Sequence, residues 1–424
     1  MKRDDQNYRE FTLDNGLFVA LQNTPTQTVS GRLRVFQGAL HEQPGEEGLA
    51  HFLEHTIVNA GSRKYSPHEI RETMANFGYM NAFTSQSQTT YPVDMLSEDV
   101  ETYLDLIADA VTYPRFDKIK VDEERQRILR EIADIKSAPD FIDKKALVIE
   151  VFGKDSPHVY QVFGKEDIVT KATPDDLQRI HERGYHAANM DLILAGGLPE
   201  NIEELVTEKL GKIPRGKNQK YIFPRNRALE ENCFLHSSAP ELLNRENPQA
   251  STAVIYLTFP VCTEGDEDYY AMIMLANFLC KSASSYLFNK LSRRMGIAYD
   301  IGGDYDYLDN KGLITIWGKI DASRKEEAFR GIFESMRSFQ DDNIPIENLK
   351  IMTGKTKYHL AKTFESNSGH VGIIEAKLDR GFSPEQYFRE LENVTPEQVQ
   401  EAANKYLPVP DGKYVLLLRD PLKQ

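Results

Sequence analysis

Two histidines and a glutamate stand close together near the N-terminus, in the segment GLAHFLEH at positions 48–55. In an α-helix, His51 and His55 lie one turn apart on a single face, and Glu54 lies beside them. Imidazole nitrogens bind Zn²⁺ at about 2.0–2.1 Å, and a catalytic zinc has three protein ligands and one open position. The order H-x-x-E-H inverts the commoner H-E-x-x-H. The segment therefore predicts a zinc site that needs a third ligand.

A carboxylate on a second predicted helix can supply that ligand. Residues 122–132, DEERQRILREI, have a strongly helical composition. Glu124 and Glu131 are seven positions apart in this segment, so they share a helix face. Both glutamates are candidates on this spacing alone.

The H-x-x-E-H motif followed by the helix E-R-x-x-x-L-x-E-I resembles the pitrilysin and mitochondrial processing peptidase family, the inverzincin zinc metallopeptidases. Residues 13–17, LDNGL, are similar to the opening strand of that family. Residues 78–91, GYMNAFTSQSQTTY, are similar to its N-A-x-T strand. The resemblance covers essentially the whole chain, is weaker in the second half, and points to a short prokaryotic-type member.

The resemblance implies one Zn²⁺ per chain, held by His51, His55 and Glu131. The ion lowers the pKa of a bound water toward about 7. Glu54, which is not a ligand, is expected to accept the proton of that water and pass it to the leaving amine. Metal-bound histidines usually donate their second ring nitrogen to a carboxylate or carbonyl, and Glu124 is placed for that role.

Two further sets of site residues follow from the resemblance. Asn81, Ala82 and Thr84 are expected to contact the backbone of a peptide that adds as an edge strand. An ordinary edge strand without a ligand is the alternative interpretation. The residues therefore predict selectivity for extended, short or unfolded peptides rather than a strict side-chain code.

The C-terminal half of the family's site supplies an arginine and a tyrosine seven residues later. Tyr299, in the segment GIAY, matches the tyrosine, but the position of the arginine holds Ser292. Arg293 and Arg294 stand one and two residues further on. A homologous second subunit is therefore expected to complete the site, and a homodimer in which Arg293 or Arg294 substitutes is the alternative.

Composition narrows the class of protein. The 424 residues include 40% hydrophobic and 27% charged residues, and the formal net charge is −14. This acidity disfavours nucleic acid and anionic membrane surfaces as partners. The N-terminus lacks the apolar run of a signal peptide, and no stretch approaches about 18 apolar residues, so a cytoplasmic protein is expected. Cys233, Cys262 and Cys280 have no metal-like spacing and are interpreted as buried thiols.

Local patterns predict the elements that position these residues. Alternating apolar residues predict a hairpin turning at Asn15-Gly16, and the stretch from Asn81 to about Met95 is predicted to run as one strand. Ser66 and Thr173 are predicted helix N-caps. His68 is interpreted as a surface residue, and three other histidines are interpreted as structural: His158, His181 and His186.

The second half repeats the order of elements of the first, which indicates an internal duplication with a period of about 210 residues. We expect an α+β protein with two homologous halves, each a mainly antiparallel sheet with helices on one face, forming half of a clamshell chamber. The counterpart of the zinc helix, residues 275–281, carries no histidine. The predicted domains are a zinc-binding domain at 1–215, a linker at 216–232 and a metal-free domain at 233–424.

The leading hypothesis is a zinc endopeptidase for short or unfolded peptides, acting as the metal-bearing subunit of a two-subunit complex. Leader or precursor processing is one candidate role. The alternatives are a self-sufficient homodimeric peptidase and a non-catalytic scaffold subunit of the same fold. The complete set of His51, Glu54, His55 and Glu131 argues against a scaffold.

Overall fold

The structure is a computed structural model, and it describes residues 7–153, 162–218, 220, 241–242, 252–281, 284–308, 311–342, 344–381, 383–408 and 414–419. These residues form two units. Unit 1 consists of the described residues within Met1–Ser137, Tyr160–Arg227 and Leu360–Pro384. Unit 2 consists of the described residues within Ala138–Val159, Ala228–His359 and Glu385–Gln424. The units thus follow the two halves of the sequence, apart from two exchanged segments. The predicted linker at 216–232 lies mainly outside the described residues, so that boundary stays a prediction.

The sheet of unit 1 has seven strands among the described residues, in the order β1-β2-β7-β3-β6-β4, and β5 also pairs with β6. The β2–β7 pair is parallel and the other pairs are antiparallel. The predicted hairpin at Asn15-Gly16 joins β1 to β2, and Gly16 has a φ of 90°, a value that favours glycine. The strands are β1 (Tyr8–Thr12), β2 (Phe18–Asn23), β3 (Thr28–Val35), β4 (Tyr79–Met80), β5 (Phe83–Thr84), β6 (Thr89–Leu96) and β7 (Met190–Gly196).

The segment from Asn81 to Met95 is a hairpin, and the prediction of one strand was wrong. The backbone N–H of Ser85 donates to the carbonyl of Gln88 at 2.7 Å, and the N–H of Gln88 donates to Ser85 Oγ at 3.1 Å. These bonds close a tight turn, so β5 folds back on β6. A serine that bonds the nearby backbone in this way favours a turn over a continuous strand.

Helices that cover unit 1 begin where their caps predict. Ser66 accepts from the N–H of Glu69, and Thr173 accepts from the N–H of Asp176, so both predicted N-caps are confirmed. The central helix is α1, which packs against α4 and α7. The helices are α1 (Leu49–Asn59), α2 (Pro67–Asn76), α3 (Val100–Thr112), α4 (Lys118–Ser137), α6 (Glu166–Lys171), α7 (Pro174–Gly184), α8 (Ile202–Leu210) and α12 (Asn367–Arg380).

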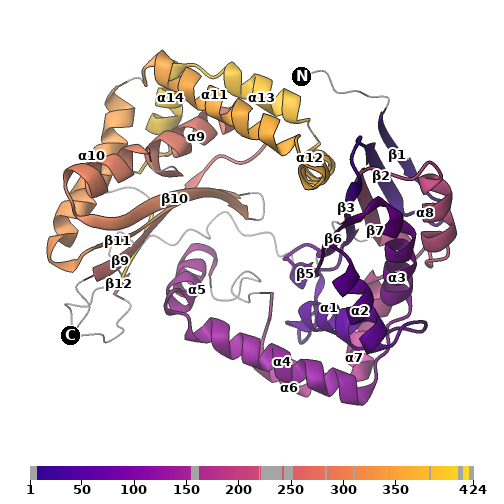
Figure 1. The fold of residues 1–424 in the computed structure, drawn as a ribbon. Coiled ribbons are helices and arrows are strands. Elements are labelled where there is room, and N and C mark those ends of the chain that lie inside the picture. The colour runs from indigo at the N-terminus through magenta and orange to yellow at the C-terminus, as the bar shows by residue number, and fades with distance from the viewer. Residues whose placement is uncertain are drawn as a thin grey trace. The chain divides into compact units, whose positions relative to one another are not determined.

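Helix α12 packs on β3 and β7, although it comes from the C-terminal half of the sequence (Figure 1). Its Val371 and Ile374 bury Ile193 and Ala195 of β7. The alternate residues Leu192 and Leu194 of β7 point to the opposite face of the sheet. Helices therefore cover both faces in unit 1, whereas the resemblance predicts helices on one face only.

A buried ion network also joins α12 to the sheet. Arg34 of β3 is fully buried and donates to both carboxylate oxygens of Asp191, at 2.7 and 2.5 Å. Its remaining nitrogen donates to both oxygens of Asp379 on α12, each at 2.9 Å. Because both partners come from elements distant in sequence, this arginine fixes α12 in place on the sheet.

Unit 2 has a five-stranded sheet within the described residues, in the order β10-β11-β9-β12-β8, and only the β12–β8 pair is parallel. Helix α5 packs on β12. The strands are β8 (Glu241–Leu242), β9 (Thr252–Val261), β10 (Ala298–Leu308), β11 (Lys311–Asp321) and β12 (Val415–Arg419). The helices are α5 (Pro139–Phe152), α9 (Tyr269–Ala276), α10 (Lys325–Asp341), α11 (Ile346–Thr363), α13 (Pro384–Glu392) and α14 (Pro396–Tyr406).

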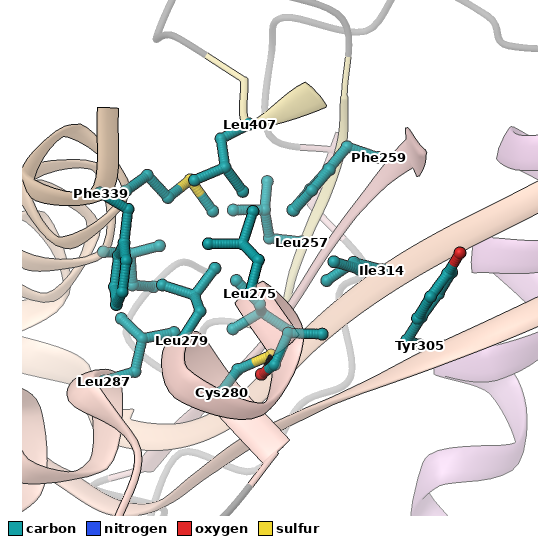
Figure 2. Close-up of a cluster of buried hydrophobic side chains, with 14 of the residues drawn as sticks. Leu257, Phe259, Leu275, Leu279, Cys280, Leu287, Tyr305, Ile314, Phe339 and Leu407 are labelled. Atoms are coloured by element: carbon teal, nitrogen blue, oxygen red, sulfur yellow. Dashed lines mark hydrogen bonds between the residues drawn. The ribbon is translucent and has the colours of Figure 1, made fainter. Parts of the chain in front are cut away.

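The counterpart of the zinc helix is a core element in unit 2. Leu275 of α9, and Leu279 and Cys280 of the π-helical turn that continues it, lie among buried side chains such as Leu257 and Phe259 (Figure 2). Burial raises the pKa of the Cys280 thiol to about 12. Cys262 is also buried, which confirms the expectation for both thiols, while Cys233 lies outside the described residues.

We predict that Arg34→Met destabilises unit 1 by about 3–5 kcal/mol, because the substitution leaves the buried carboxylate of Asp191 without its partner. Chemical unfolding followed by circular dichroism measures this loss. The control is Arg9→Met on β1, whose ion pair with Glu203 is exposed and whose loss should cost only about 0–1 kcal/mol. Equal losses for the two variants would contradict the assignment of Arg34 as the anchor.

Candidate active site

The start of α1 fixes the position of the histidine pair. Gly48 precedes the helix with a φ of 100°, and a Cβ there would come within 2.4 Å of the carbonyl oxygen of Phe163. The buried carboxylate of Glu42 accepts from the N–H groups of Gly48 and Ala50, each at 2.9 Å. A negative charge at this position also interacts favourably with the helix dipole. The carboxylate of Glu42 and the close backbone of Phe163 thus fix the first turn of α1, which carries His51.

His51 and His55 lie together with Glu131 of α4. The Oε2 atom of Glu131 lies 3.8 Å from Nε2 of His51 and 3.6 Å from Nε2 of His55. Ligands of a tetrahedral zinc at 2.0–2.1 Å are separated by about 3.4 Å. Among the described residues, these three form the one group with the donor types and spacing to hold a metal ion, within 4.8 Å of one another. The donor set therefore fits zinc.

Burial and the neighbouring charges act in opposite directions on the two imidazoles. Burial, and then the charge of His55, lowers the pKa of His51. Burial also acts to lower the pKa of His55, but hydrogen bonds to Glu124 and Glu131 outweigh it and raise that pKa. The two shifts have opposite signs because His55 lies against two carboxylates and His51 lies beside His55.

Glu124 lies behind His55, away from the metal group. Its Oε2 atom is 3.4 Å from Nδ1 of His55 and accepts from Nδ2 of Asn59 at 3.2 Å. Only 3% of its side chain is exposed. Glu131 and Glu124 therefore meet opposite ring nitrogens of the same histidine, which separates the two candidates that spacing alone left open.

Glu54 is buried beside the metal group without belonging to it. The hydroxyl of Thr84 donates to its Oε2 atom at 2.7 Å. Burial raises the pKa of Glu54, although the bond from Thr84 opposes the shift. The carboxylate is thus a stronger proton acceptor than an exposed glutamate.

The metal group opens into a cleft of about 730 Å³ within unit 1. All three residues predicted to contact substrate border it together with the metal group. The cleft is lined by His51, Glu54, His55, Val58, Asn59, Asn81, Ala82, Phe83, Thr84, Gln86, Glu131, Ile135, Val162 and Phe163. The second edge of β5 has no strand partner within the described residues, which leaves its backbone groups unpaired by any strand there.

Several of these lining residues were not predicted. Asn59 follows His55 by one helical turn, so the periodicity of α1 was a usable signal for it. Val162 and Phe163 are distant in sequence from the motif and reach the cleft only through packing. The apolar members of the lining give the cleft a mixed polar and apolar character.

A larger cavity of about 850 Å³ lies elsewhere in unit 1, beside His181 and His186. Their Nε2 atoms bond the carbonyls of Val111 and Lys217, each at 2.7 Å. Both histidines are therefore structural, as expected. His68 is exposed on α2, while His158 lies outside the described residues.

Tyr299 belongs to unit 2 and is not among the residues that unit 1 gathers. It lies at the start of β10, and 66% of it is exposed. Ser292, Arg293 and Arg294 lie in the π-helical turn Phe288–Arg294. The guanidinium of Arg293 stands 5.6 Å from the centre of the Phe288 ring.

Two family models match the chain in tandem. Residues 18–155 match insulinase, peptidase family M16, and residues 171–352 match the peptidase M16 inactive domain. The chain belongs to peptidase family M16. The first matched segment contains the whole metal group, and the second includes the half in which α9 replaces the histidine helix.

Relatives of the chain are named zinc proteases, which supports zinc-dependent hydrolysis at the level of the family. The chain is 27% identical to the zinc protease YmxG of Bacillus subtilis, over 94% of this chain and 95% of that protein. It is 28% identical to a zinc protease of Mycobacterium tuberculosis, over 96% of this chain and 92% of that protein.

Solved structures share the fold. A protease from Helicobacter pylori has a TM-score of 0.80 at 18% identity, covering 98% of this chain and 99% of that one. The first half of the periplasmic protease PqqL from Escherichia coli has a TM-score of 0.78 at 18% identity, covering 98% and 92%. Against the longer PqqL chain, the match covers 99% of this chain but 48% of that one. Among the described helices, none has the length and apolar character needed to cross a membrane.

We predict that His51→Ala and Glu131→Gln each lose zinc, because either change removes one of three ligands. Glu124→Gln should keep the metal but bind it about 10- to 100-fold more weakly. Zinc per chain after dialysis against a chelator, measured by atomic absorption, tests this order. His68→Ala, an exposed histidine on α2, is the matched control. Zinc retained at the control level in the Glu131→Gln variant would refute the ligand set.

Proposed function

We propose that the chain is a zinc endopeptidase for short or unfolded peptides and the metal-bearing subunit of a two-subunit complex. The observation that carries this proposal is the convergence of His51, His55 and Glu131 in a cleft that also contains Glu54 and a free strand edge. Membership of family M16 and the names of the relatives support the chemistry at family level.

The residues of the site have distinct tasks in this proposal. His51, His55 and Glu131 hold the zinc, which supplies a Lewis acid and an activated water when bound. Glu54 takes a proton from the attacking water and gives it to the leaving amine, a transfer that its raised pKa favours. Glu124 holds the His55 ring through Nδ1, which leaves Nε2 on the side of Glu131, where it would bind the metal.

The substrate adds as a strand beside Asn81, Ala82 and Thr84. A peptide that pairs in this way is recognised through its backbone groups, so the site selects extended peptides and excludes folded ones. The apolar residues Val58 and Phe83 on the cleft wall add contacts for neighbouring side chains. A role in leader or precursor processing is consistent with such a site, because leaders are extended peptides.

A second subunit is proposed because the site lacks one expected cation. Position 292 holds serine, and Arg293 packs on Phe288. The match of this chain to 48% of the longer PqqL chain supports a site assembled from two such lengths of chain. The intact set of four metal and base residues disfavours a scaffold. A cytoplasmic location stays a prediction, since PqqL is described as periplasmic.

The Glu54→Gln variant should still bind zinc but should hydrolyse peptides much more slowly, because the amide cannot accept the proton of the water. We expect the rate to fall roughly 10²–10⁴-fold with zinc content unchanged. Peptide hydrolysis and zinc analysis on the same preparation measure both effects. Glu72→Gln, an exposed change on α2, is the control. An empty site in the Glu54→Gln variant would make Glu54 a ligand and the proton-transfer role wrong.

The isolated chain should hydrolyse peptides weakly, and a homologous partner with the Arg/Tyr pair should raise the rate by about 10²–10³, the contribution of one positioned donor. Steady-state assays with and without a homologous protein that carries R-x-x-x-x-x-x-Y but lacks H-x-x-E-H test the proposal. Full activity of the isolated chain that Arg293→Ala or Arg294→Ala abolishes would favour the homodimer. Full activity that neither substitution lowers would overturn partner complementation altogether.

A further inference from the structure

Thr84 of β5 makes a contact that its expected role on the substrate strand does not require. Its hydroxyl donates to Oε2 of Glu54 on α1 at 2.7 Å. Hydrogen bonds to an ionised group are roughly twice as strong as neutral ones. A residue of the peptide-binding edge thus holds the carboxylate assigned to proton transfer.

The Thr84 hydroxyl is directed to Glu54 by the residues around it. Its other neighbour is Thr89 Oγ1, at the longer distance of 3.2 Å. The hydroxyl of Thr89 donates to the carbonyl of Gln37 at 2.9 Å. Thr89 can therefore only accept from Thr84, so the single proton of Thr84 has two possible acceptors. It goes to Glu54, which is the closer of the two and a carboxylate.

The backbone groups of residues 81–85 alternate between the side of β6 and the opposite edge of the strand. The N–H of Asn81 donates to Pro92 at 3.1 Å and that of Ser85 donates to Gln88 at 2.7 Å, both on the β6 side. In an antiparallel pair, the intervening residues Ala82 and Thr84 turn their backbone groups to the opposite edge. A peptide that joins this edge therefore pairs beside the residue whose side chain holds Glu54.

We propose that Thr84 is a positioning residue for Glu54, which locks the carboxylate in one orientation and ties that orientation to the strand that receives the peptide. The inference rests on the proposed peptidase function, because it assigns Thr84 an effect on turnover. A peptide seated on this strand therefore meets a base whose orientation is set by Thr84 of the same strand. The side chain of Thr84 acts through Glu54, whereas its expected role was contact with the backbone of the peptide.

The test compares Thr84→Val, which keeps the shape and the β-branch but removes the donor, with Thr84→Ser, which keeps the hydroxyl. With the complete enzyme, Thr84→Val should lower kcat about 10- to 100-fold with KM unchanged within about twofold. Thr84→Ser should restore most of kcat. Thr90→Val, an isosteric change on the adjacent strand, is the control and should leave both constants unchanged.

A double-mutant cycle separates positioning from general loss of structure. In a Glu54→Gln background, Thr84→Val should have no further effect on kcat, because the group through which it acts is already gone. An undiminished second loss would show that Thr84 acts independently, and so would a Thr84→Val variant that raises KM alone. Either result overturns the proposal.

A readout other than turnover keeps this inference separate from the proposed function. Crystal structures of zinc-loaded Thr84→Val and Thr84→Ser should show the Glu54 carboxylate displaced in the first and held in the second. Thr84→Ala replaces Thr84→Val if the latter does not fold. An inactive wild-type complex would refute the peptidase proposal, while an unmoved Glu54 in these structures would refute the role of Thr84.

Discussion

The site depends on the packing of α1 against α4, which brings carboxylates of one helix to imidazoles of the other. Glu124 and Glu131 lie at the two ring nitrogens of His55, Glu54 precedes that histidine in the chain, and Glu124 and Glu54 are buried. Carboxylates that lose hydration in this way are costly unless a cation or several donors compensate. The donors present are Asn59, Arg127 and Thr84, and a divalent ion at the histidines would add the strongest compensation.

Local spacing predicted the parts of this site that lie on one element. The i and i+4 positions of His51 and His55 require only that α1 be a helix, and the caps at Ser66 and Thr173 depend on three or four adjacent residues. The separate tasks of Glu124 and Glu131 were not readable from their seven-residue spacing, because they depend on the angle at which α4 crosses α1. The resemblance supplied that assignment, and the distances to the two ring nitrogens of His55 agree with it.

Other features escaped prediction for the same reason. The turn at Ser85–Gln88 is favoured over a continuous strand by two hydrogen bonds of the Ser85 hydroxyl, which β-propensity does not reveal. The contact of Thr84 with Glu54 joins segments thirty residues apart and appears only when β5 folds back beside α1. The packing of α12 on β3 and β7 was also unpredicted, since nothing in residues 367–380 identifies the sheet that they cover. These contacts are long-range, so a sequence pattern carries little information about them.

The two halves solve one packing problem in two ways. A helix that packs on a sheet buries one of its own faces. The other face of the helix can carry either functional side chains or further apolar residues of the core. In α1 the polar positions carry His51, Glu54 and His55, and their cost is offset by α4 and β5. In α9 and the turn after it, Leu275, Leu279 and Cys280 fill the corresponding region with apolar contacts.

The metal half thus has less hydrophobic burial at its centre, and the ion network of Arg34 with Asp191 and Asp379 supplies anchoring on the other face of its sheet. Because Asp379 comes from α12, residues 1–215 alone lack part of that anchor, and the metal half depends for its stability on a segment of the second half of the sequence.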